Sequence, residues 1–128
     1  MSIPPRTRIL VVDDDLSLRV LTTIILAREG LSPTAVGSVP RALDRMTESP
    51  VDAVLTDLVM PCLDGLDLIR ALRRSSPETP VVAMSGSDDE LVGRALALGA
   101  RSVVRKPFTR EELVGAIRDA LGERRAAA

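Results

Sequence analysis

A short run of aliphatic residues followed by apolar residues at helical spacing occurs five times along this chain, and this alternation constrains the fold more than any other feature. The aliphatic runs are residues 9–12, 31–36, 51–57, 81–84 and 102–104. Strands that alternate with helices pair in parallel, because each helix carries the chain back across the sheet. Strands that are apolar throughout are covered on both faces. The sequence therefore predicts an α/β fold, a doubly wound five-stranded parallel sheet with helices on both faces.

Local signals indicate where several of these elements begin and end. Pro33 favours an edge position for the second strand, because proline has no N–H to donate to a neighbouring strand. Asp15 follows the first strand and is a candidate N-cap for the helix behind it. Thr109 and Glu112 have the spacing of a capping box, which predicts a last helix over residues 110–121. Residues 122–128 are then interpreted as a polar tail or the start of a linker.

Length and composition exclude several classes of protein. A chain of 128 residues favours one domain. Its 17 basic and 18 acidic side chains give a net charge of -1, and Phe108 is its single aromatic residue, so we expect no direct binding to nucleic acid. Without histidine, and with Cys62 as the only cysteine, a disulfide within the chain or a zinc site is not expected. No apolar segment is long enough to span a bilayer and no signal-peptide pattern is present, so we expect a cytoplasmic protein without membrane insertion.

Polar side chains follow four of the five predicted strands, at the point where each strand ends. They are Asp13, Asp14, Asp15, Asp57, Ser85 and Lys106, the last of these being the only lysine of the chain. Each one alone has an ordinary interpretation as a helix cap, a turn residue or a solvated charge. The carboxyl ends of parallel strands, however, meet at the edge of the sheet where ligands bind.

The chemistry of this set points to phosphoryl transfer. Clustered carboxylates repel one another unless a cation lies among them. Mg²⁺ takes carboxylate oxygens together with a phosphate oxygen, and a lysine serves as a point charge for the phosphate. We therefore expect an aspartate nucleophile at this edge, with Mg²⁺ and Lys106 neutralising the transferred group. The glycine motifs that bind nucleotides are missing from the sequence, so a nucleotide is not the expected donor.

Taken together, four segments resemble the receiver domain of two-component response regulators. They are residues 9–15 (ILVVDDD), 57–61 (DLVMP) with Asp64-Gly65, 84–86 (MSG) and 106–108 (KPF). The resemblance extends over about residues 7–121, which we interpret as one receiver domain. It implies a flavodoxin-like fold and a signalling phosphoacceptor, not an enzyme. The phosphoryl group would come from a histidine kinase or a histidine phosphotransfer protein, and would switch the interaction with an unknown downstream protein or effector domain.

The resemblance also implies a role for each residue at the strand ends. Asp57 is the phosphoacceptor, Ser85 binds the phosphoryl group and Lys106 pairs with it. These three residues make up the implied catalytic set. Mg²⁺ is the implied cofactor, and its ligands are Asp13, Asp14, Asp57 and the carbonyl of Val59.

One position departs from the family pattern. Response regulators commonly carry Tyr or Phe three residues before the lysine, where this chain has Val103. A β-branched valine is stiff at χ1 and too short to swing between surface and interior. We therefore expect switching through Ser85 and the loop after the fourth strand, without an aromatic rotamer change. Val59 and Ser87 resemble positions that tune dephosphorylation in the family. The resemblance also implies a cis Lys106-Pro107 bond, which an X-Pro sequence permits but does not demand.

The first helix follows the acidic loop, so we expect it to form part of the surface that meets the kinase. Its leucine-rich pattern predicts that it faces mostly the core. Exposed positions such as Arg19 would then be left to contact the partner. The sequence leaves open whether the chain is a single-domain regulator or the receiver of a larger protein.

Two other functions remain open at this point. Residues 11–17 also resemble the first motif of haloacid-dehalogenase-type phosphatases, in which Asp13 would be the nucleophile and Asp15 the acid/base, with Ser85 and Lys106 as further motifs. That family needs another acidic motif after the lysine, and Asp57 would have no role in it. The third function is an interaction module that keeps the receiver fold and signals without phosphorylation. The missing aromatic residue favours this module, and the complete acidic set disfavours it.

Overall fold

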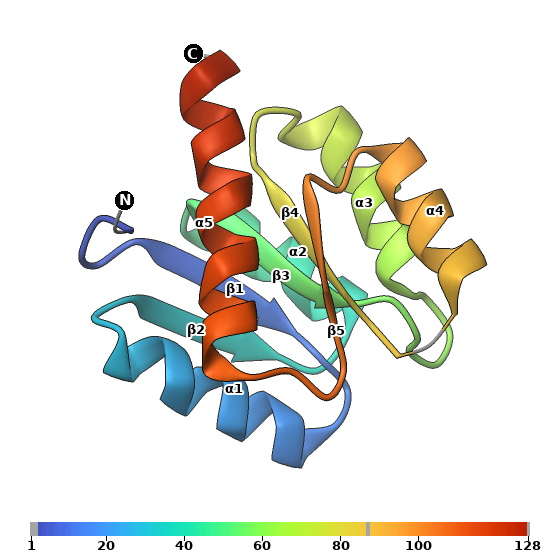
Figure 1. Ribbon diagram of the computed structural model, residues 1–128. Helices are drawn as coiled ribbons and strands as arrows, with labels where there is room; N and C mark the ends of the chain where they lie inside the picture. The colour runs from blue at the N-terminus through green and yellow to red at the C-terminus, as the bar shows by residue number, and fades with distance from the viewer. Residues whose placement is uncertain (1–2, 87, 128) are drawn as a thin grey trace.

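The computed structural model describes residues 3–86 and 88–127, and this part of the chain forms one five-stranded sheet and five helices (Figure 1). The elements alternate along the chain as β1 (Arg8–Val12), α1 (Leu16–Arg28), β2 (Ser32–Val36), α2 (Val39–Glu48), β3 (Ala53–Asp57), α3 (Gly65–Ser75), β4 (Val81–Ser85), α4 (Asp89–Leu98), β5 (Ser102–Arg105) and α5 (Arg110–Ala127). Within the described residues, every helix is too short or too polar to cross a membrane.

All neighbouring strands are parallel, in the order β2-β1-β3-β4-β5. The chain passes outward from β1 to β2, then crosses to β3 on the other side of β1 and continues to β5. This is a doubly wound, flavodoxin-like receiver fold, as the sequence predicts. The strand with Pro33 lies at an edge of the sheet, so that expectation is also confirmed. The winding brings the carboxyl ends of β1, β3, β4 and β5 to one edge.

Two apolar layers cover the two faces of the sheet. Successive residues of a strand point to opposite faces, so Leu10 lies in one layer and Ile9 in the other. The layer around Leu10 includes buried residues of α2, α3 and α4, whereas the layer around Ile9 includes residues of α1 and α5. In Figure 1, α5 accordingly passes in front of the strands and α2 lies behind them.

The predicted helix starts are formed by the predicted caps. Asp15 accepts a hydrogen bond from the backbone N–H of Leu18 at 3.1 Å, and α1 begins directly after it. The backbone N–H of Thr109 donates to Glu112 Oε1 at 2.9 Å, and the N–H of Glu112 donates to Thr109 Oγ1 at 3.1 Å. These reciprocal bonds complete the capping box at the start of α5.

The end of α5 corrects one predicted boundary. The sequence predicts that the last helix ends at Leu121, but α5 continues to Ala127. The residues after Gly122 are glutamate, arginine and alanine, all strong helix formers, and no proline interrupts them. A polar composition alone does not end a helix. Buried core residues reach as far as Leu121, and the boundary between a receiver domain of residues 7–121 and a tail of residues 122–128 stays a prediction.

The orientation of α1 corrects a second expectation, because most of its large apolar side chains do not face the core. Leu16, Val20, Leu21 and Ile24 are 62%, 49%, 50% and 43% exposed. Of the residues of α1, only Thr22 and Leu26 are buried. The helix lies over β1 and β2, and β2 is the edge strand, so no further strand extends beyond it to cover the outer side of the helix. The apolar spacing therefore predicts the helix correctly, but it does not predict that this stripe of apolar side chains faces the solvent.

Candidate functional site

Asp57 ends β3 at the carboxyl edge of the sheet, where it is only 8% exposed. Its Oδ1 accepts a hydrogen bond from the backbone N–H of Val59 at 3.3 Å. Its Oδ2 accepts one from Lys106 Nζ at 3.0 Å. Each carboxylate oxygen thus has a fixed donor, and one of the two donors is a cation.

Lys106 follows β5 and reaches back over the same edge. Its backbone N–H donates to the carbonyl of Ser85 at 2.7 Å, which ties the residue to the end of β4. Its Nζ lies 3.0 Å from Asp57 Oδ2 and 3.3 Å from Asp13 Oδ2, so one ammonium bridges two carboxylates. The Lys106-Pro107 bond is cis, as expected.

Asp13 and Asp14 complete an acidic cluster with Asp57. Asp13 is fully buried and its Oδ1 accepts the backbone N–H of Asp15 at 3.0 Å, whereas Asp14 is exposed. Each of the three aspartates has an oxygen within 4.8 Å of an oxygen of the other two. Carboxylate oxygens at this spacing suit a hard divalent cation, and the exposed Asp14 leaves an open side for water and substrate.

Burial and charge shift the pKa of both partners of the central ion pair. Burial raises the pKa of the Asp57 carboxyl, and this outweighs the hydrogen bond and charge of Lys106, which lower it. Burial alone would lower the pKa of Lys106, but the hydrogen bond and charge of Asp57, reinforced by Asp13, raise it overall. Lys106 is therefore held as an ammonium ion beside the carboxylates.

Ser85 ends β4 and contributes a hydroxyl that is buried without a hydrogen-bond partner in the described part of the chain. A buried polar group without a partner is unusual, because desolvation of such a group costs free energy. A bound anionic oxygen would satisfy this hydroxyl. The unpaired hydroxyl, the lysine and the three carboxylates together fit a site for Mg²⁺ and a phosphoryl group.

The remaining residues singled out by the sequence have less central places. The side chain of Val59 is 64% exposed, and its N–H contacts Asp57. Val103 is half-buried and packs against the apolar layer that includes α4. Asp15 is committed to capping α1. Ser87 lies outside the described residues.

A model of the response regulator receiver domain matches residues 9–118, which is most of the chain. The chain belongs to the response regulator receiver family. Among curated relatives, the DNA-binding response regulator MtrA of Mycobacterium tuberculosis (strain ATCC 25618 / H37Rv) is 40% identical over 114 residues, covering 88% of this chain and 50% of MtrA. This receiver chain thus spans about half the length of the first curated relatives it matches.

Other relatives of this receiver domain match over their whole length. A probable chemotaxis protein CheY of Rhizobium etli is 35% identical over 127 residues, which cover 95% of this chain and 98% of that protein. The solved receiver domain of NtrX from Brucella abortus superposes with a TM-score of 0.85 at 32% identity, over 89% of this chain and 98% of NtrX's domain. A receiver domain protein from Clostridium thermocellum gives a TM-score of 0.88 at 29% identity, over 95% and 99% of the two chains.

Arg19 and Gly65 support the receiver site in ways that the sequence did not indicate. Arg19 was expected at an exposed position, but it is half-buried and its Nη1 donates to the carbonyl of Asp13 at 2.8 Å. A Cβ on Gly65 would lie 2.3 Å from the carbonyl oxygen of Asp57, so only glycine allows α3 to start so close to β3. Neither contact is local in sequence, and only the aspartate-glycine pair 64–65 offered a signal.

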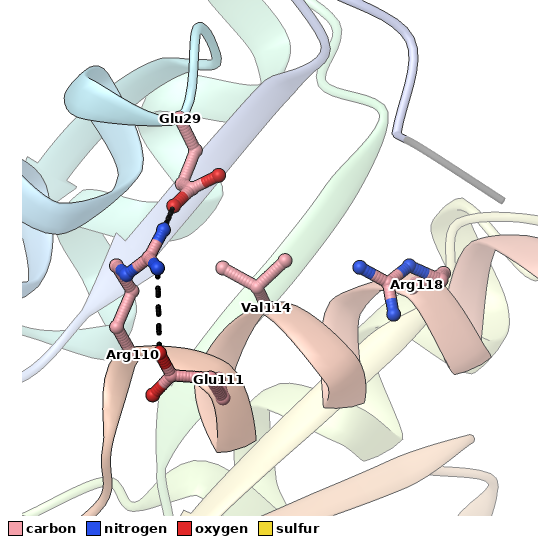
Figure 2. Close-up of a pocket in the computed structure, with 5 residues that line it drawn as sticks. All are labelled: Glu29, Arg110, Glu111, Val114 and Arg118. Carbon is pink, nitrogen blue, oxygen red and sulfur yellow. Dashed lines mark hydrogen bonds and ion pairs between the residues drawn. The ribbon is translucent and has the colours of Figure 1, made fainter.

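A hollow of about 230 Å³ lies along α5 and does not include any residue of the acidic cluster (Figure 2). Three of its charged side chains are paired: Arg110 contacts Glu29, near the end of α1, and Glu111 on α5 itself. The hydrogen bond and charge of Glu29 raise the pKa of Arg110. The Arg110–Glu29 pair joins the end of α1 to the start of α5, and nothing about either pair suggests phosphoryl chemistry.

Proposed function

We propose that this receiver domain accepts a phosphoryl group on Asp57 from the phosphohistidine of a sensor kinase or phosphotransfer protein, in a reaction that requires Mg²⁺. The observation that carries the proposal is the placement of Lys106 Nζ within hydrogen-bond distance of Asp57 and Asp13, beside a third carboxylate. A structural ion pair needs one carboxylate for each lysine. Three carboxylates around one lysine leave a negative excess that suits a bound cation.

The transfer exchanges one phosphorus bond for another. A carboxylate oxygen of Asp57 attacks phosphorus, the bond from phosphorus to the donor imidazole nitrogen breaks, and the imidazole keeps the electron pair of that bond. The product is an acyl phosphate on Asp57. Lys106 neutralises charge on the transferred group, and the hydroxyl of Ser85 donates to one of its oxygens.

Mg²⁺ bound by Asp13, Asp14 and Asp57, with the Val59 carbonyl as a further ligand, would offset the charge of the incoming phosphoryl oxygens. Asp13 and Asp57 are already oriented by hydrogen bonds from backbone N–H groups. The protein then acts as a phosphoacceptor that assists its own phosphorylation and dephosphorylation, and it does not turn over a separate substrate.

The two alternative functions are less well supported. In a haloacid-dehalogenase-type phosphatase Asp15 would have to exchange protons with the substrate, whereas here it caps α1 through the N–H of Leu18. Asp57, which would be idle in such an enzyme, is instead the residue that Lys106 contacts most closely. An interaction module without phosphorylation would have no use for an acidic cluster with a buried, unpaired hydroxyl beside it.

A sensor kinase and a downstream effector are the partners that the family implies. We place the kinase contact on the exposed apolar side of α1, which begins directly after Asp14 and Asp15. The exposed apolar side chains of this surface are Leu16, Val20, Leu21 and Ile24. An exposed apolar stripe beside an acidic site suits an amphipathic helix of a partner that must bring a phosphohistidine to Asp57.

The proposal is tested by treating the protein with a small acyl-phosphate donor, with and without Mg²⁺, and measuring intact mass. We expect one phosphoryl adduct that needs Mg²⁺, is lost in Asp57→Asn and is cleaved by hydroxylamine. Asp44→Asn, an exposed aspartate of α2, is the matched control and should be phosphorylated normally. An adduct that persists in Asp57→Asn, or that forms equally well with a chelator present, would contradict the assignment.

A further inference from the structure

Arg19 turns back from α1 toward the acidic loop that precedes the helix. It is half-buried, and its Nη1 donates to the carbonyl oxygen of Asp13 at 2.8 Å. Its backbone N–H already bonds to Asp15 in the first turn of α1. The side chain therefore reaches from α1 back across the loop, and its guanidinium contacts the backbone of Asp13 in the acidic cluster.

The carbonyl that Arg19 holds belongs to the peptide unit between Asp13 and Asp14. That unit is planar, so fixing its oxygen also fixes the direction in which the chain leads to Asp14. The other side of Asp13 is fixed by its N–H, which bonds to the carbonyl of Val36 at 3.2 Å, and by its carboxylate. Asp14 itself is exposed, so the hydrogen bond from Arg19 acts on the less constrained carboxylate of the cluster.

Gly37 provides the space that this arrangement needs. It follows β2, and a Cβ at this position would lie 2.8 Å from Arg19 Nη1. The nearest atoms to that Cβ all belong to the Arg19 guanidinium, so an added methyl group would meet a flexible side chain rather than backbone. A surface hollow of about 380 Å³, lined by both residues and by Arg41, lies beside them and gives the displaced guanidinium room to move.

From this geometry we infer that Arg19 is a positioning residue of the Mg²⁺ site, seated against Gly37, and that it acts by holding the Asp13–Asp14 peptide in the orientation that binds the metal. The inference rests on the proposed function. The contact also couples the loop between β2 and α2 to the acidic site, because Gly37, against which the Arg19 guanidinium packs, belongs to that loop. Groups that orient metal ligands from behind commonly change metal affinity by about tenfold or more when they are removed.

Two variants break the same contact from opposite sides. Arg19→Ala removes the donor, and Gly37→Ala keeps the arginine and its charge but displaces the guanidinium. Arg28→Ala, in the last turn of α1, is the control for loss of an arginine, and Gly93→Ala, where an added Cβ meets nothing within 4 Å, is the control for the added methyl group. The double variant of Arg19 and Gly37 tests whether both act through one contact.

The measurements are calorimetric titration of chelator-treated protein with MgCl₂ and the amide resonance of Asp14 in the metal-free protein. We expect both single variants to bind Mg²⁺ about tenfold more weakly and to shift the Asp14 amide. The double variant should be no weaker than Arg19→Ala, and both controls should match the wild type, as should the folded fraction of every variant.

The outcomes separate this inference from the proposed function. Wild-type protein that takes up no Mg²⁺ would overturn the metal site and the inference with it. Wild-type binding together with unchanged affinity in Gly37→Ala would overturn the inference alone. Tighter binding in Arg19→Ala would also overturn it, because the arginine would then act on the metal only by charge repulsion.

Discussion

In the proposed function, the buried hydroxyl of Ser85 is the group that would link the resting protein to its response. Its Oγ has no partner among the residues described, and leaving a buried hydroxyl unpaired costs about 1–3 kcal/mol. A phosphoryl oxygen on Asp57 would accept a charge-assisted hydrogen bond from it. Phosphorylation of Asp57 would then relieve a cost that the resting state carries, so we expect Ser85 to favour the phosphorylated state.

The first prediction is that Ser85→Ala separates stability from signalling. The free energy of unfolding should stay the same or rise by up to about 1–3 kcal/mol, because alanine removes a buried hydroxyl that makes no hydrogen bond in the resting state. The amide shifts that beryllofluoride and Mg²⁺ cause at Gly86 and Glu90 should disappear. Chemical denaturation and NMR measure the two quantities. A loss above about 2 kcal/mol would show that the hydroxyl has a resting partner after all.

Cys62 carries the second prediction, since it has a φ of 66° in a region that favours glycine. It is exposed and free. Cys62→Gly should change the free energy of unfolding by less than about 1 kcal/mol, because relief of strain offsets the greater freedom of glycine in the unfolded chain. Cys62→Val should cost about 1–2 kcal/mol, because a β-branched residue is strained there. Equal stability of the two variants in urea would contradict this.

At the residue scale, the sequence identified the groups that end strands and could not identify those that reach the site from elsewhere. Asp57 and Ser85 follow directly from the ends of apolar runs, and strand topology brings them to one edge. Arg19 lies on α1 and meets Gly37 only through the packing of that helix against the loop between β2 and α2. A leucine pattern likewise predicts a helix but does not predict which of its faces packs against the core. For this reason the helix was expected to bury most of its apolar side chains, whereas Leu16 is exposed.

The junction of β3 and α3 sets the third prediction, at the scale of elements. A Cβ on Gly65 would meet the carbonyl oxygen of Asp57 at 2.3 Å and the Cα of Leu58 at 2.9 Å, and neither backbone atom can yield easily. Gly65→Ala should therefore cost about 1–3 kcal/mol of stability and slow phosphorylation of Asp57. Gly93→Ala, in α4, is the control and should lose no stability. Normal stability and phosphorylation of Gly65→Ala would refute the close approach.

The contact between β5 and the start of α4 leads to the fourth prediction. Arg105 stands on the same face of β5 as Val103, forms an ion pair with Asp89 and donates to the carbonyl of Gly86 at 3.5 Å. This contact links β5 to Gly86, the residue after Ser85, and we expect it to restrain the loop in the resting protein. Val103 is expected to be too short to report phosphorylation, so we expect Arg105 to be the side chain that responds.

Asp89→Asn should accordingly raise the affinity for beryllofluoride with Mg²⁺ by about two- to fivefold, because an exposed ion pair contributes at most about 1 kcal/mol. Glu90→Gln removes a neighbouring acidic group from the same helical turn and is the control. Affinities are measured by NMR titration. If the two variants bind equally, the ion pair does not restrain the loop.

At the scale of elements, turn and cap chemistry made the strands and helix starts predictable, while a helix end without a stop signal was not. Asp15 and the capping box at Thr109 are local in sequence, so their hydrogen bonds could be foreseen. Gly122 did not end α5, because residues that favour helix follow it. Pro33 marked the edge strand because its missing donor forbids a central place.

For the whole molecule, the alternation of strands and helices predicted a doubly wound parallel sheet, and the carboxyl ends of its strands predicted where the candidate site lies. The flavodoxin-like form of that sheet came only from the resemblance to receiver domains. Parallel strands wound outward from β1 bring four strand ends together, whatever the details of packing. The topology does not predict which downstream protein or effector domain responds to the receiver domain. Relatives that match over half their length and relatives that match over nearly all of it share the same receiver domain.

The last prediction concerns the stability of the whole domain in Mg²⁺. A ligand that binds only the folded state adds about 1.4 kcal/mol when its free concentration is ten times its Kd, which raises Tm by about 5 °C for a domain of this size. The cluster of Asp13, Asp14 and Asp57 exists only in the folded chain, so the whole cooperative unit should gain this stability. Asp14→Asn, at the exposed ligand, should reduce the gain without disturbing the core. Thermal unfolding is followed by circular dichroism at constant ionic strength, with NaCl replacing MgCl₂ as the control. A rise in Tm of the same size in NaCl, or an undiminished rise in Asp14→Asn, would mean that the acidic cluster does not bind the ion.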